Sequence, residues 1–464
     1  MAHHATAARD RIPLIEKVAF GLGMAIPIAF INSVAQLTNL IFNLGLGVSV
    51  VWLGVVQMIP RLWDAVSDPL TGYFSDNTRS RWGRRRPYII AGGIASAVTY
   101  VLLWWAPEAW PEWALLAYIL GVSLLFYTAT TVFSVPLTAL GYEMSLDYHE
   151  KTRLFAIGSF LGNIFAIVTP WMYWLANNEV FDNEVEGMRT IAVGVGVVVL
   201  ITALLPGLLC RERRQVEIAT QERVKFWSSL ATTARDGVFL RVVGIVFLIT
   251  CGFNFVNNFT NYIVIFFVYG GDRVAASEML AYNGSVWAIT CLLAVLPMTW
   301  TSEKVGKART VQLFVGFMLG GSLLKIVCYN PALPWLTLIP TVFISAGMLA
   351  LYTMAVSMVA DVANLDQLKH GVRREGTYAA VYSWWLKVAV SAGFLVSGIL
   401  LQSTGFDDKV VTQSADTLFW MRFWEIGLPA VLCGLAIFLL RGYPLTEERV
   451  YQIKAELEQQ KART

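Results

Sequence analysis

Twelve apolar stretches of about 20 residues or more constrain this chain most, because each is long enough to cross a hydrocarbon core of about 30 Å. Hydrophobic residues make up 56% of the 464 residues and charged residues only 14%, a balance that excludes an ordinary soluble domain. The sequence therefore predicts an all-α protein embedded in a lipid bilayer, with spans at 18–46, 50–74, 88–106, 113–140, 154–176, 190–209, 239–269, 279–300, 310–328, 334–360, 376–402 and 417–441.

Basic residues gather in alternate connections between these spans. The second-to-third connection holds five arginines between positions 79 and 86, whereas the alternate connection at 177–187 is acidic. By the positive-inside rule, both termini are expected in the cytoplasm. The predicted location is a multi-pass position in the cell inner membrane.

The sequence also shows an internal duplication. SD at 75–76 precedes GRRR at 83–86, and SE at 302–303 precedes GKAR at 306–309. Their matching places in two six-span halves indicate paired six-helix bundles, the major facilitator architecture. The predicted parts are a cytoplasmic N-terminus (1–17), an N-terminal bundle (18–209), a cytoplasmic linker (210–238), a C-terminal bundle (239–441) and a cytoplasmic tail (442–464).

Three charged residues lie within eight positions of the second span: Arg61, Asp64 and Asp68. An ionised side chain at bilayer depth costs from about 3 to more than 10 kcal/mol, so each needs a partner or a function. Helical spacing places both carboxylates on one face, where they would suit a small cation, Na⁺ or H⁺. The alternative is an Arg–Asp pair that only lets the helix insert.

Two long motifs carry a family resemblance. RLWDAVSDPLTGYFSDNTRSRWGRRRPYII at 61–90 and ADVANLDQLKHGVRREGTYAAVYSWWLK at 360–387 resemble the signatures of the glycoside–pentoside–hexuronide:cation symporters. The resemblance implies the major facilitator fold, with twelve transmembrane helices in two pseudo-symmetric bundles. It also implies secondary active symport of a sugar or glycoside with Na⁺ or H⁺.

The resemblance assigns roles to individual residues. Asp64 and Asp68 match the carboxylates that coordinate the coupling cation, and Thr131 matches a hydroxyl ligand. Ser67 stands where the family has another polar residue and is a further expected cation-binding residue. If the cation is sodium, Asp64, Asp68 and Thr131 are its expected ligands. The expected coupling or gating residues are Arg61, Asp76, Arg84, Asp361, Arg373, Glu375 and Lys387.

The sequence departs from the family at the sugar site. In the family, acids of helices one and four and an arginine of helix five bind the sugar. Aligned on the signature, the acids fall near Ile28 and Ser134, and the arginine falls near Ser159. The coupling site is therefore expected to be retained while the sugar site is rebuilt.

Carboxamides form two stripes in spans one and seven, at Asn32, Gln36, Asn39 and Asn43, and at Asn254, Asn257, Asn258 and Asn261. Amides donate and accept hydrogen bonds without adding charge, which suits a hydroxyl-rich solute. The alternative is that they join helices to one another. The predicted substrate-binding residues are Asn32, Gln36, Asn39, Tyr127, Ser134, Asn257, Asn258, Trp384 and Lys387.

Other functions find less support. The sequence shows no phosphate-binding loop or nucleophile arrangement, so neither an enzyme nor a nucleic-acid partner is expected, and the coupling ion is the only cofactor. The expected partner is a small hydrophilic solute, carried by a monomer. A carrier of a lysolipid or another amphiphile and a non-transporting nutrient sensor remain as alternatives. Lys325 and Glu425 lie near span ends and are expected to reach the interface or pair locally.

Overall fold

The computed structural model describes residues 11–145, 147–212, 236–371, 374–445 and 447–463. Within these ranges the chain is helical and contains no β-strand, which confirms the predicted all-α fold class. The chain divides into two compact units. Unit 1 comprises Met1–Thr220 with Arg273–Ser285, and unit 2 comprises Gln221–Asp272 with Val286–Thr464.

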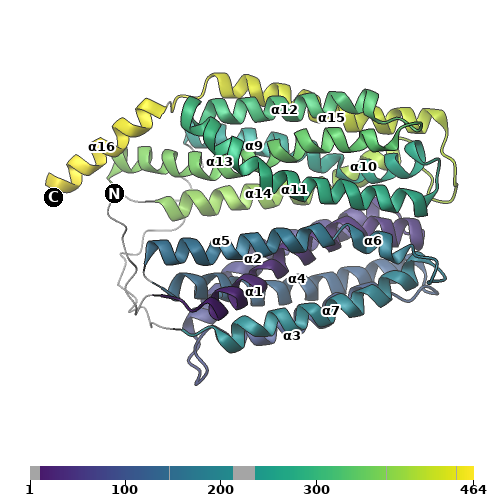
Figure 1. Cartoon of the computed structure of the whole chain (residues 1–464), viewed down its shortest axis with the longest axis horizontal. Helices are drawn as coiled ribbons and strands as arrows, with labels where there is room; N and C mark the ends of the chain where they lie inside the picture. The colour runs from purple at the N-terminus through teal and green to yellow at the C-terminus, as the bar shows by residue number, and fades with distance from the viewer. Residues whose placement is uncertain (1–10, 146, 213–235, 372–373, 446, 464) are drawn as a thin grey trace. The chain divides into compact units, whose positions relative to one another are not determined.

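Unit 1 is a bundle of helices in which α1 packs on α5 and α7, α3 packs on α4 and α7, and α2 packs on α4 (Figure 1). Side chains of Asp147 and Asn183 accept backbone N–H groups and so define where α5 and α7 begin. The helices are α1 (Leu14–Thr38), the π-helix η2 (Asn39–Gly45), α2 (Val50–Asn77), α3 (Arg86–Trp104), α4 (Glu112–Glu143), α5 (Tyr148–Val168), α6 (Trp171–Ala176) and α7 (Glu184–Leu209).

A glycine allows α3 and α4 to approach closely. A Cβ atom at Gly92 would lie 2.6 Å from the backbone nitrogen of Phe133, so any larger residue would push the two helices apart. Small residues permit such close contacts between membrane helices. This contact fixes the part of α4 that carries Tyr127 and Thr131.

In unit 2, α12 packs on α13 and α15, while α9 packs on α14 and α15. Its core includes the buried residues Phe314, Met318 and Met348. The elements are α9 (Gly237–Phe255), α10 (Asn257–Ile263), the π-helix η3 (Val264–Val268), α11 (Arg273–Val305), α12 (Lys307–Cys328), the 3₁₀-helix η4 (Pro334–Thr337), α13 (Leu338–His370), α14 (Glu375–Ser403), α15 (Ala415–Arg441) and α16 (Glu447–Arg463). The first residues of α11 belong to unit 1.

Eleven helical segments of the described chain are long and apolar enough to cross a membrane, and each overlaps a predicted span. The twelfth predicted span is α2, a helix of 28 residues. It is less apolar than the others because Arg61, Asp64 and Asp68 interrupt it. The eleven segments are Leu14–Gly45, Arg86–Trp104, Glu112–Glu143, Glu150–Ala176, Glu184–Leu209, Gly237–Val268, Arg273–Val305, Lys307–Cys328, Pro334–His370, Gly376–Ser403 and Ala415–Arg441.

The first span of each half ends in the same irregular way. Val48 donates to the carbonyl of Phe42 at 3.0 Å, and Gly271 donates to that of Ile265 at 2.8 Å, six residues back in both cases. These bonds close the π-helices η2 and η3, a type of helix that is frequent at functional sites. The shared ending supports the duplication predicted from the sequence.

Candidate functional site

The candidate cation site lies on α2, where it faces α4. Asp64 and Ser67 are buried, with exposed fractions of 8% and 4%, and Asp68 is half-buried. From α4, the hydroxyl of Thr131 donates to Oδ1 of Asp68 at 3.0 Å. Ser67 Oγ is buried and has no hydrogen-bond partner among the described residues. The structure therefore brings together Asp68 and Thr131, and Ser67 precedes Asp68 on the same helix.

Two prolines flank this segment of α2. Pro60 and Pro69 lie inside the helix and lack an N–H group, so they cannot donate to the carbonyls of Val56 and Ala65. The candidate site residues Asp64, Ser67 and Asp68 all lie between these two prolines.

Arg61 begins the site one turn before Asp64. Its guanidinium carbon lies 5.0 Å from the centroid of the buried Tyr127 ring, which is the geometry of a cation–π contact. Tyr127 also interacts electrostatically with Asp64. The predicted substrate residue Tyr127 is therefore part of the charged cluster on α2 and α4.

The donor set of this cluster is made of oxygen atoms. Carboxylate, hydroxyl and carbonyl oxygens are the ligands that hard cations prefer, whereas soft metals select sulfur and imidazole. Among the described residues, no group of three or more His, Cys, Asp or Glu side chains could hold a metal ion.

The carboxamide stripe of the first span divides into two parts. Asn39 is buried, and its Oδ1 accepts a hydrogen bond from Gln57 Nε2 of α2 at 3.2 Å. Asn43 is also buried and donates to the Val48 carbonyl at 2.8 Å. By contrast, Asn32 and Gln36 are exposed. The Asn43 side chain thus stabilises the end of the span. Sequence reasoning missed Gln57, the hydrogen-bond partner of Asn39.

The other predicted substrate residues are distributed over both units. Ser134 is half-buried on α4 in unit 1. In unit 2, Trp384 of α14 is 50% exposed and Lys387 is half-buried. Asn257 and Asn258 lie on α10, and their side chains are outside the described part of the structure.

The signature arginines between α2 and α3 bind acids within unit 1. Arg85 Nη2 lies 2.8 Å from Asp76 and 2.7 Å from Glu143, and Arg84 Nη2 lies 2.6 Å from Glu143. Arg86 donates to the carbonyls of Gly207 and Leu208 at the end of α7. Asp76 and Arg84, both predicted to gate, therefore belong to a clamp that joins α2, α3, α4 and α7.

Glu212 completes this clamp. Its carboxylate accepts the backbone N–H groups of Arg84, Arg85 and Arg86 at 3.0, 2.8 and 3.2 Å, at the N-terminus of α3. Gly83 has φ +98°, and a Cβ atom there would lie 2.5 Å from Glu212 Oε1. Sequence reasoning missed both Glu143 and Glu212, because neither has a signature of its own.

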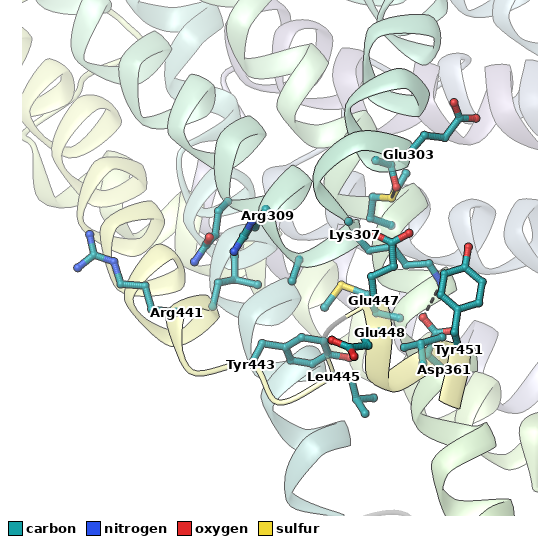
Figure 2. Close-up of a pocket in the computed structure, with 18 of the residues that line it drawn as sticks. Glu303, Lys307, Arg309, Asp361, Arg441, Tyr443, Leu445, Glu447, Glu448 and Tyr451 are labelled. Atoms are coloured by element: carbon teal, nitrogen blue, oxygen red, sulfur yellow. Dashed lines mark hydrogen bonds and ion pairs between the residues drawn. The ribbon is translucent and has the colours of Figure 1, made fainter. Parts of the chain in front are cut away.

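The matching end of unit 2 contains a cavity of about 750 Å³, lined by α11, α12, α13, α15 and α16 (Figure 2). Lys307 of α12 pairs with the buried Asp361 of α13 in its wall. Burial raises the pKa of Tyr443, as does the charge of Asp361, so the phenol stays neutral. Two other residues predicted to gate fall outside the described part of the structure: Arg373, and the side chain of Glu375. Lys307 is the partner of Asp361 in this structure.

We expect Asp361→Asn to loosen this end of unit 2 and to favour the conformation that is open there. A cysteine placed at Ser302, in the wall of the cavity, should then react faster with a maleimide in a cysteine-free background. Lys307→Met removes the same pair and should act in the same way. Lys304→Gln removes a nearby cation that lies over Trp300 and should leave labelling unchanged. Equal labelling in all variants would contradict the role of the pair.

Comparisons with known proteins show a family match and several similar transporters. The MFS/sugar transport protein family matches residues 19–447. The isoprimeverose transporter of Lactiplantibacillus pentosus is 25% identical, with 100% of this chain and 97% of the relative covered. The human sodium-dependent lysophosphatidylcholine symporter 1 is also 25% identical, with 87% and 78% covered. The crystal structure of a D-xylose-proton symporter superposes with a TM-score of 0.66 at 14% identity, and covers 93% of this chain and 97% of its own.

Proposed function

Because the chain belongs to the MFS/sugar transport protein family, a family of multi-pass membrane transporters, we propose that it is a cation-coupled symporter. It moves a neutral, hydroxyl-rich solute together with Na⁺ or H⁺ across the cell inner membrane. The two units then expose the solute site to each side in turn. Its termini lie in the cytoplasm, in agreement with the distribution of basic residues.

The hydrogen bond from Thr131 to Asp68 is the observation that carries this proposal. It joins α4 to α2 at the carboxylate pair, so the second and fourth spans share one set of oxygen ligands. A structural Arg–Asp pair would need only one acid and no hydroxyl from another helix. The buried Ser67 hydroxyl adds a further oxygen to the set.

Charge explains why cation and solute move together. Two carboxylates in the membrane interior carry a cost that a bound cation reduces. The cation therefore favours the conformation in which the solute site is complete. Because coupling between two binding sites is reciprocal, bound solute must also tighten cation binding.

The solute is proposed to be a sugar or glycoside. The exposed amides Asn32 and Gln36 offer donors and acceptors without charge. The resemblance places the acids that bind sugars elsewhere in the family near Ile28 and Ser134, where this chain has no acid. Recognition by neutral hydrogen bonds is thus favoured, and the sugar-transporting relatives are consistent with it.

We expect Asn39→Ala to weaken apparent solute affinity by about ten- to hundredfold, because a buried polar group without its partner costs about 1–3 kcal/mol. Uptake kinetics in vesicles would measure the change, and cation dependence should persist. Gln57→Leu is the matched control, because it removes the hydrogen-bond partner of Asn39 and keeps the Asn39 amide itself. If both variants lower only thermal stability and leave affinity unchanged, Asn39 joins helices and does not bind solute.

A lysolipid or other amphiphile is the second candidate substrate. The observation that favours it is the similarity to the human lysophosphatidylcholine symporter, at the same 25% identity as the sugar transporter. An amphiphile carrier should accept long-chain substrates and ignore free sugars.

Reconstituted vesicles test these proposals directly. Labelled monosaccharides, disaccharides, uronic acids and a lysophospholipid are offered with a sodium gradient, with a proton gradient and with neither. We expect uptake of one hydrophilic class, driven by one of the two gradients. Gradient-driven uptake of the lysophospholipid alone would establish the second candidate. Equal uptake with and without gradients would refute coupling.

A further inference from the structure

The second half of the seventh span depends on its neighbours for its position. The helix α9 ends at Phe255, and Val256 has φ −116° and ψ 8°, outside helical geometry. The short helix α10 and the π-helix η3 follow, and Gly270 and Gly271 end them with φ +62° and +98°. Because α10 has only seven residues, side-chain contacts must fix where it lies.

A fully buried carboxylate of α15 supplies the strongest of these contacts. Glu425 has an exposed fraction of 0%. Its Oε1 accepts from Lys325 Nζ at 2.7 Å and from the hydroxyls of Tyr329 and Thr260 at 2.6 Å each. Its Oε2 is buried and has no hydrogen-bond partner among the described residues. Three donors therefore meet at one oxygen atom: Thr260 of α10, Lys325 of α12, and Tyr329, which directly follows α12.

The charges in this cluster form a buried ion pair. The ammonium of Lys325 neutralises Glu425, and removing one member of a buried pair leaves an uncompensated charge. The two hydroxyl donors bind the same carboxylate oxygen as Lys325. Among the residues that contact Glu425 Oε1, only Thr260 belongs to α10. Its hydroxyl therefore links the Glu425–Lys325 pair to the seventh span.

A second contact of α15 holds the same segment. The guanidinium carbon of Arg422, one turn before Glu425, lies 4.2 Å from the centroid of the Phe267 ring in η3. Arg422 also donates to the carbonyl of Ile326 in α12. On another side, Phe406 packs edge-to-face against Tyr262 at 4.9 Å. The α15 contacts thus define one side of the α10–η3 segment.

We propose that Glu425 is a positioning residue for solute binding, acting through Thr260. The tie holds α10 in the place where its described amide, Asn261, meets the solute. This inference rests on the proposed transport function. It assigns a role to the buried Glu425–Lys325 pair of the C-terminal half. The pair sets solute affinity and takes no part in cation binding.

Thr260→Val tests the tie, because it removes the hydroxyl, keeps the side-chain volume and leaves the Glu425–Lys325 pair intact. Direct replacement of Glu425 is less informative, since the unpaired Lys325 could prevent folding. Hydrogen exchange of the full-length protein should show faster exchange for residues 257–268 and no change for 237–255. The solute KM in vesicles should rise about tenfold, with kcat and the cation dependence unchanged.

Two further variants serve as controls. Thr260→Ser keeps the hydroxyl and should behave like the wild type. Thr301→Val removes a hydroxyl that donates to the Pro297 carbonyl of its own helix, and should change neither exchange nor KM. Unchanged exchange at 257–268 in Thr260→Val, or faster exchange with an unchanged KM, would overturn the inference. If the wild type carries no solute of the panel, the proposed function fails, and the exchange experiment still decides whether the tie exists.

Discussion

Asp64→Asn and Asp68→Asn should each abolish concentrative uptake, which is the largest functional effect that the structure leads us to expect. Each change removes one negative charge and one oxygen ligand from α2, while the buried volume stays almost the same. Without the charge, the site no longer gains from binding a cation, and the gradient cannot drive the solute. Initial rates and steady-state accumulation in vesicles would show the loss.

Solute exchange between two loaded compartments separates coupling from binding. It needs no gradient, so both variants should retain it if the solute site is intact. Thr131→Val is the graded control: it removes one hydroxyl that donates to Asp68 and should weaken apparent cation affinity by about tenfold. Accumulation at wild-type levels by both aspartate variants would exclude this site as the coupling site.

Glu143→Gln should cause the largest loss of stability among the single substitutions considered for unit 1. The side chains of Glu143 and Arg85 are each 8% exposed, and Arg84 binds the same carboxylate oxygen. Removing one member of a buried pair costs about 3–5 kcal/mol. Arg85 would keep Asp76 as a partner, but Asp76 is 53% exposed and compensates the charge only in part. Thermal unfolding of the purified protein in detergent would measure the change.

Glu108→Gln is the matched control. Glu108 is 44% exposed and lies 2.7 Å from Arg189, so it is also part of a Glu–Arg pair in unit 1. An exposed pair contributes about 0–1 kcal/mol, and its loss should have little effect. If both variants lower the unfolding temperature equally, the buried pair at Glu143 contributes no more to stability than the exposed pair at Glu108.

The fold was largely predictable because long apolar stretches have few alternatives in a bilayer. Each predicted span overlaps a helix, and α2 was recognised as a span although Arg61, Asp64 and Asp68 make it less apolar. The break at Val256 was not predictable, since no proline or glycine marks it in the sequence. Such a break depends on packing around the helix and not on local propensity.

Site residues were predictable only where charge stands out against an apolar background. Asp64 and Asp68 were predicted as site residues in this way, and the resemblance added Thr131. Glu143 is the last residue of α4, where acids are common and usually solvated, and the sequence predicted an interfacial or locally paired place for Glu425 as well, although it lies well inside α15. Only the folded structure shows that Glu425 is fully buried and shared by three donors.

The contact of Glu212 with the N-terminus of α3 has a practical consequence for dividing this carrier into two co-expressed polypeptides. Helix α7 ends at Leu209, which would suggest a cut immediately after it. Such a cut would remove the carboxylate that accepts the N–H groups of Arg84, Arg85 and Arg86. The N-terminal fragment should therefore extend past Glu212, because the last residues of this half stabilise the first turn of a helix that begins more than a hundred positions earlier.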